Sequence, residues 1–165
     1  VLVFLRAEPE ALGLTRFDWR WFGLGLLLVI PFMMISAGWI SLVESLSGPQ
    51  DEQSIVETIR DPGSQSEMVA GLIYAVLVAP IAEEILFRGF LLGAIERAGG
   101  AALAVVASGV LFGLFHISDP ITLVPLTLMG VCLGWLYIRS RSLWSCWAMH
   151  VGNNAVSLGF VVLAE

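Results

Sequence analysis

The sequence predicts an all-α protein, a polytopic bundle of about five transmembrane helices, and three observations support this fold class. Hydrophobic residues make up 58% of the 165 residues and charged residues only 13%. The mean hydropathy is +0.88, which is far from the composition of a soluble domain. The apolar residues also gather in several blocks near the length that crosses a bilayer, where helices satisfy their own backbone groups.

The N-terminal region, residues 1–67, is predicted to hold one membrane helix and an acidic loop. The helix spans about residues 21–43 with Trp near both ends, as is typical of the two membrane interfaces. Pro31 should kink this helix. Residues 44–67 are acidic and rich in Ser, Gly and Pro, which indicates an exposed loop on the non-cytoplasmic side, with one amphipathic turn around residues 55–59.

The C-terminal region, residues 68–165, is predicted to be a four-helix core that carries the chemistry. Gly99-Gly100 and Asp119-Pro120 should interrupt the helical pattern. Asn153 and Asp119 are expected to be helix-end or loop groups. Glycines that suit close helix packing recur in the middle of the core, namely Gly109, Gly113, Gly130 and Gly134. The predicted helices span about residues 67–98, 101–117, 120–138 and 143–163.

The positive charges predict how the bundle is oriented. Under the five-helix arrangement, seven arginines fall at one end and only Arg60 falls at the other, with most of the loop acids. Positive residues favour the cytoplasmic side. The arginines at this end are Arg6, Arg16, Arg20, Arg88, Arg97, Arg139 and Arg141. The apolar helices predict a lipid bilayer as the partner of the chain. The net charge of -6 is not informative about nucleic acid, but the chain has no basic patch, so we expect no nucleic-acid partner.

Two adjacent carboxylates in an apolar helix are the most informative feature of the chain. Charged groups at membrane depth are costly and mark functional sites. Glu83 and Glu84 point about 100° apart on a helix, so they cannot do one job together. Glu84 and Arg88 are four residues apart with the acid first, which favours an ion pair. Glu83 is then the free carboxylate.

Both histidines of the chain also lie in apolar helices. Glu83 and His116 are each about sixteen residues from the Gly99-Gly100 turn, so an antiparallel hairpin places them at the same height. His150 and Asn154 are four residues apart and share a helix face. We therefore expect these four side chains to meet about a third of the way into the membrane from the cytoplasmic side.

A carboxylate, two imidazoles and a carboxamide are sufficient to hydrolyse an amide bond. The carboxylate can deprotonate a water that one imidazole orients, and the other imidazole and the amide can donate to the oxyanion. Glu83, His116 and His150 could instead hold Zn²⁺ with an open position for water. The residues leave both chemistries open.

These residues resemble the three motifs of the CAAX-protease and bacteriocin-processing (CPBP/Abi) family of intramembrane proteases. The motifs are Glu83-Glu84-x-x-x-Arg88, Phe112-x-x-x-His116 and His150-x-x-x-Asn154, and the resemblance covers about residues 68–160. Members typically have more helices before the core than the single one predicted here. We therefore expect further N-terminal helices to precede this chain, which opens inside an apolar run.

The resemblance implies an intramembrane endopeptidase in a prokaryotic cell membrane, with its active site open to the cytoplasm. Glu83 would be the general base, His116 would share the water with it, and His150 with Asn154 would stabilise the oxyanion. Glu84, Arg88 and Phe112 would support the site. Eukaryotic and archaeal relatives trim prenylated CAAX proteins, whereas bacterial relatives are linked to bacteriocin maturation or self-immunity.

Two other functions fit the same residues. The fold could act without catalysis, as an immunity protein or as a subunit of a larger membrane complex. The buried carboxylates could also serve a proton-coupled transporter, although the one-sided placement of the polar groups does not favour transport. A peptide or prenylated protein is the substrate that the endopeptidase hypothesis predicts.

Overall fold

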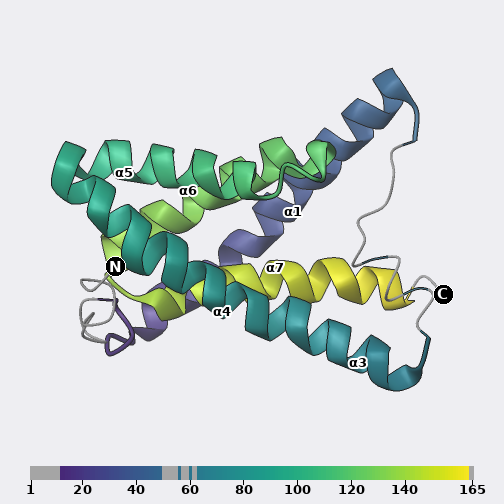
Figure 1. Ribbon diagram of the computed structural model, residues 1–165, viewed down its shortest axis with the longest axis horizontal. Coiled ribbons are helices and arrows are strands. Elements are labelled where there is room, and N and C mark those ends of the chain that lie inside the picture. The colour runs from purple at the N-terminus through teal and green to yellow at the C-terminus, as the bar shows by residue number, and fades with distance from the viewer. Residues whose placement is uncertain (1–11, 50–55, 57–59, 61–62, 164–165) are drawn as a thin grey trace.

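The computed structural model describes residues 12–49, 56, 60 and 63–163, and every regular element in these residues is helical (Figure 1). Four helical stretches among them are long and apolar enough to cross a membrane: residues 19–47, 65–115, 120–140 and 143–163. The protein is therefore an integral membrane protein. The elements are α1 (Trp19–Ser47), α3 (Gln65–Ile73), η2 (Tyr74–Val78), α4 (Ala79–Glu84), η3 (Ile85–Leu92), α5 (Gly93–Phe115), η4 (Pro120–Thr122), α6 (Leu123–Ser140) and α7 (Leu143–Leu163).

The second stretch is bent into two arms at Gly100, which explains why about five helices were predicted. Gly100 has φ 83° and ψ 171°, a conformation that interrupts the helix and that only glycine adopts without strain. The predicted break at Gly99-Gly100 is confirmed. Figure 1 shows α5 folded back beside α6, away from the α3–α4 arm.

The two π-helical segments, η2 and η3, were not predicted. They flank α4, the single short α-helical segment that carries both Glu83 and Glu84. Isolated π-helical turns are uncommon and often occur at functional sites. The region predicted as one helix over residues 67–98 is thus helical throughout but changes its hydrogen-bond pattern on both sides of the two acids.

The other predicted boundaries differ only at their ends. The first helix runs from residue 19 to 47, longer than the predicted 21–43, and it continues through Pro31. α5 ends at Phe115 and η4 starts at Pro120, as the Asp119-Pro120 signal predicts. The predicted turn around residues 55–59 lies outside the described residues, apart from residue 56, and so do Arg6 and the opening apolar run.

α5 and α6 pack closely through the predicted glycines. A Cβ atom on Gly109 would lie 2.6 Å from the backbone nitrogen of Val131, and one on Gly130 would lie 2.7 Å from the Gly109 Cα. Both distances are shorter than real Cβ contacts, so the two backbones touch where no side chain fits. The prediction of close helix packing at these glycines is confirmed.

α1 joins the same bundle by packing along α7. At Gly25 an added Cβ would meet the backbone carbonyl of Ser145, and at Gly152 it would lie 2.9 Å from Val29. Hydrogen bonds also join the chain before α1 to the start of α7. The Ser142 hydroxyl donates to the Arg16 carbonyl at 2.5 Å, and the Trp144 indole donates to the Leu14 carbonyl at 2.7 Å.

The glycine contact generates a first prediction. Gly130→Ala should lower the free energy of unfolding by about 1–3 kcal/mol, because the new methyl group forces α5 and α6 apart. Gly38→Ala is the matched control, since that helical glycine has no atom near the added Cβ and alanine favours helix. Thermal unfolding in detergent measures both, and equal melting temperatures for the two variants would contradict the packing account.

Candidate functional site

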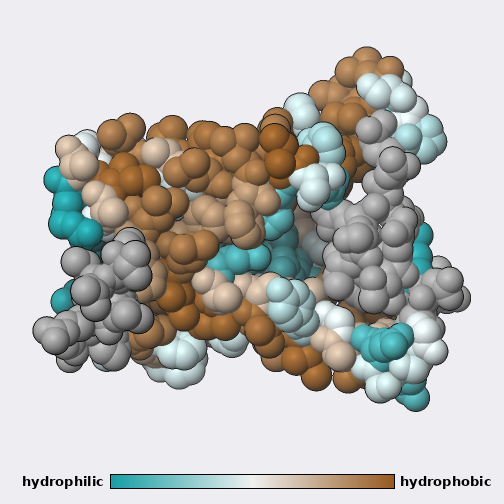
Figure 2. Space-filling model, viewed as in Figure 1, coloured by the Kyte–Doolittle hydropathy of each residue, from teal (hydrophilic) through white to brown (hydrophobic). Residues whose placement is uncertain are grey.

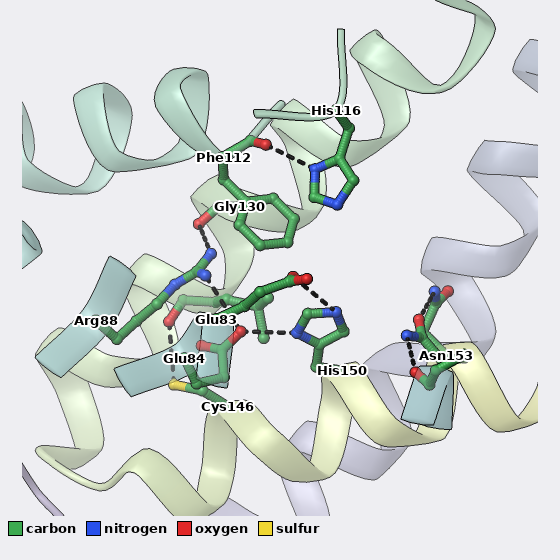
Figure 3. Close-up of polar contacts among 12 residues, drawn as sticks. Glu83, Glu84, Arg88, Phe112, His116, Gly130, Cys146, His150 and Asn153 are labelled. Carbon is green, nitrogen blue, oxygen red and sulfur yellow. Dashed lines mark hydrogen bonds and ion pairs between the residues drawn. The ribbon is translucent and has the colours of Figure 1, made fainter. Parts of the chain in front are cut away.

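Glu84 is the buried centre of the site. Its carboxylate oxygen Oε1 lies 3.2 Å from Arg88 Nη1 and 2.8 Å from His150 Nδ1, and all three side chains are almost fully buried. The predicted ion pair with Arg88 is confirmed. The contact with His150 was not predicted, and it means that Glu84 both neutralises the arginine and holds a histidine of the site (Figure 3).

The Glu84 contact decides which nitrogen of His150 faces the site. A carboxylate only accepts hydrogen bonds, so His150 Nδ1 carries a proton and donates it to Glu84. The other ring nitrogen, Nε2, lies 3.7 Å from Glu83 Oε2. This distance is too long for a hydrogen bond, so the two atoms face each other without a direct bond.

Arg88 is held from three sides. Besides Glu84, its Nη2 donates to the backbone carbonyl of Gly130 at 3.0 Å. Its guanidinium carbon lies 4.7 Å from the centre of the Phe112 ring, which adds a cation–π attraction in a dehydrated place. The close α5–α6 contact at Gly130 puts this carbonyl within reach of the arginine. Every residue has a backbone carbonyl, so the sequence could not indicate that Gly130 would be the partner of Arg88.

Phe112 and His116 form the opposite wall. His116 follows the last residue of α5, and its Nδ1 lies 2.9 Å from the Phe112 carbonyl. A carbonyl only accepts, so Nδ1 donates and Nε2 is again the free ring nitrogen. The Phe112 ring centre lies 5.1 Å from that of His116 and 5.6 Å from that of His150. Figure 3 shows His116 Nε2 turned toward Glu83 and His150.

Glu83 is the carboxylate left free, as the sequence predicts. Its side chain as a whole is 19% exposed, while its Oε2 is buried and has no hydrogen-bond partner among the described residues. Figure 2 shows a hollow lined by hydrophilic residues between the α5–α6 side and the α4 side of the bundle. Glu83 thus combines partial access from outside with a free oxygen beside two imidazoles.

The amide of Asn154 is hydrogen-bonded to groups outside this cluster. Its amide nitrogen donates to the backbone carbonyl of Ala75 at 2.9 Å, and its oxygen accepts from Asn153 at 3.2 Å. Figure 3 shows Asn153 well away from His150 on the same helix. Asn153 is buried inside α7, so its expected helix-end position is wrong, because α7 runs on for ten further residues. Asp119, as expected, lies between two helices.

The site as it stands does not fit a three-ligand metal centre. Among the described residues, no group of three His, Cys, Asp or Glu side chains is placed to hold one ion. The Nδ1 atoms of both histidines are engaged with protein acceptors. This leaves Nε2 of each histidine and the Glu83 carboxylate as the atoms that could face an ion, and as placed in this structure they do not form a set that holds one.

The buried ion pair generates a second prediction. Arg88→Met should lower the free energy of unfolding by about 3–5 kcal/mol, because Glu84 is then a buried charge without its guanidinium. Adding Glu84→Gln removes that charge and should restore a large part of the loss. Arg141→Met is the control, since it breaks the exposed Arg141–Glu96 pair and should cost less than about 1 kcal/mol.

Thermal or denaturant unfolding of the unmodified protein, the two single variants and the double variant, all in the same detergent, measures these values. A loss in the Arg88→Met, Glu84→Gln double variant as large as that in Arg88→Met alone would show that the buried charge is not the cause.

Comparison with known proteins agrees with the motifs. The family described as type II CAAX prenyl endopeptidase Rce1-like matches residues 65–156, more than half of the chain. The protein named "Putative membrane peptidase YdiL" of Bacillus subtilis is 33% identical over 94 residues, which are 57% of this chain and 36% of that protein. No solved structure matches.

An uncharacterized protein of Mycoplasma capricolum is 27% identical over 138 residues, which are 82% of this chain and 38% of that protein. The chain thus spans little more than a third of the length of either relative. The matched residues 65–156 include all three motifs. The resemblance is confirmed: the chain belongs to the Rce1-like family of type II CAAX prenyl endopeptidases.

Proposed function

We propose that this protein is an intramembrane endopeptidase that hydrolyses a peptide bond with a water activated by Glu83. The observation that carries the proposal is the placement of a free, partly exposed carboxylate beside the Nε2 atoms of two histidines, one of which is fixed by the buried Glu84–Arg88 pair. Family membership supports a protease of the CAAX type.

In the proposed first step, Glu83 and His116 bind the attacking water. His116 donates through Nδ1 to Phe112, so its unprotonated Nε2 accepts a hydrogen bond from the water. Glu83 takes the other proton as general base. The hydroxide then adds to the scissile carbonyl carbon, and Glu83 passes the proton to the leaving amine when the C–N bond breaks.

His150 stabilises the oxyanion in this scheme. A second proton on its Nε2 makes the ring a donor toward the reacting carbonyl. The charged ring fits the site, because Glu83, Glu84, Arg88 and a protonated His150 together carry no net charge, and buried charges persist only when they are balanced. Glu84 keeps the ring in place through Nδ1. No step of this mechanism needs a metal ion.

We further propose that the site opens toward the cytoplasm and that its substrate is a peptide or prenylated protein at the membrane. The Arg141–Glu96 pair and the Ser142–Arg16 hydrogen bond bring the arginine-bearing segments together at one end of the bundle. His150 lies seven residues into α7 from this end, about 10 Å. Positive residues favour the cytoplasmic side.

Cleavage by the purified protein in liposomes tests the proposal. The substrate is an internally quenched peptide ending in a farnesylated CAAX sequence, and its unprenylated form is run in parallel. Glu83→Gln should lower kcat by at least about a hundredfold, because the amide cannot accept the proton from water. Its melting temperature should stay close to that of the unmodified protein.

Glu96→Gln is the matched control, since Glu96 is a helical carboxylate paired with Arg141 outside the site. It should cleave at the unmodified rate. Undiminished cleavage in Glu83→Gln would overturn the assignment of the base. A folded protein that cleaves neither peptide would instead favour the non-catalytic alternative, an immunity protein or a subunit of a membrane complex.

The metal-free chemistry has its own test. Dialysis against a strong chelator followed by metal analysis should leave cleavage within about twofold of the untreated rate, since the proposed mechanism uses only side chains. Loss of activity that returns specifically with added Zn²⁺ would show that Glu83, His116 and His150 rearrange around an ion.

A further inference from the structure

Both ends of the Asn154 amide bond to neighbouring groups of the chain, and one of its two N–H groups is used in doing so. Its nitrogen donates to the Ala75 carbonyl and its oxygen accepts from the amide nitrogen of Asn153. Turning the amide over would set its oxygen against a carbonyl and its nitrogen against another NH₂ group, so these partners fix its orientation. The amide that the resemblance assigns to the oxyanion is therefore anchored to the backbone of a neighbouring helix.

The chain itself explains why Ala75 needs this partner. In the π-helical segment η2, the N–H of Ala79 donates to the carbonyl of Tyr74, five residues back. The same step from Ala75 leads to Pro80, which has no N–H. The Ala75 carbonyl thus loses its helical donor. In a membrane, such freed carbonyls are tolerated when a neighbouring helix supplies a replacement donor.

Pro80 also lies close in the chain to the candidate base, Glu83. It is fully buried near the start of α4, three residues before Glu83. The hydrogen bond between Asn154 and Ala75 therefore ties α7 to η2, the helical segment that leads directly into α4 and its two carboxylates. α7 carries His150 one helical turn earlier on the same face, so this bond fixes the helix of the base relative to the helix of the imidazole.

We propose that Asn154 is a positioning residue whose amide replaces the backbone donor that Pro80 removes and thereby holds Glu83 at its place beside His150. This role differs from direct stabilisation of the oxyanion. Its consequence for catalysis rests on the proposed endopeptidase function, whereas the hydrogen bond itself does not. The two parts can therefore be measured separately.

A double-mutant cycle between Asn154 and Pro80 tests the hydrogen bond. Asn154→Ala should lower the melting temperature by several degrees, because a partly buried carbonyl loses its donor. Pro80→Ala restores an N–H within reach of that carbonyl, so in the Pro80→Ala background the same Asn154→Ala change should cost less than half as much. Ser157→Ala, which removes a partly buried hydroxyl from the same helix, should cost the same in both backgrounds.

Cleavage of the quenched peptide, measured well below all melting temperatures, tests the positioning role. Asn154→Ala should reduce kcat by about tenfold, since misplacing the base by a fraction of an ångström has effects of this size. The Asn154→Ala, Pro80→Ala double variant should recover most of that loss with little change in KM. A merely structural contact would change stability without this recovery of kcat.

Two results would overturn the proposal. One is an equal fall in melting temperature, or an equal failure to fold, for Asn154→Ala in both backgrounds. The other is a double variant whose stability recovers while kcat stays low, which would indicate that Asn154 stabilises the oxyanion directly. If no variant cleaves any peptide, the endopeptidase function fails, and the melting temperatures still decide whether Asn154 replaces the donor that Pro80 removes.

Discussion

The buried carboxylate of Glu84 is the interaction on which the rest of the structure depends. A charge at membrane depth persists only with partners, and Glu84 has two, Arg88 on one side and His150 on the other. Arg88 in turn needs the Gly130 carbonyl and the Phe112 ring. Five elements, α4, η3, α5, α6 and α7, thereby contribute one group each to a single connected network, so the fold and the site stabilise each other.

The main chain takes part in this network as much as the side chains do. The α5–α6 contact is close because glycines meet there, and this closeness puts the Gly130 carbonyl beside Arg88. The Phe112 carbonyl fixes one ring nitrogen of His116. The Ala75 carbonyl receives Asn154. Three backbone acceptors therefore determine how an arginine, a histidine and an asparagine are oriented. Each of these contacts also satisfies two polar groups in a region where water cannot satisfy them.

The sequence predicted the helices and the free carboxylate because apolar length and i,i+4 spacing are local signals. Glu83, His116 and His150 come together as predicted from their distances to Gly100 and from their motifs. The contact between Glu84 and His150 could not be predicted, since it depends on how α7 is rotated against α4. The π-helical turns were also missed, because their hydrogen bonds shift by one residue without a change in hydrophobic pattern. Pro80 was the feature of the sequence that could have indicated the Ala75 contact, because it lacks the N–H that this carbonyl would otherwise accept.

The most direct test of this account is the protonation of the His150 ring, measured by ¹⁵N NMR of histidine-labelled protein in bicelles. The chain has only two histidines, so a His116→Gln variant assigns every ring resonance. The account predicts a proton on His150 Nδ1 in a strong hydrogen bond to a carboxylate, which Glu84→Gln abolishes. An unprotonated Nδ1, or a His150 spectrum that Glu84→Gln leaves unchanged, would contradict the role of Glu84 as the centre of the site.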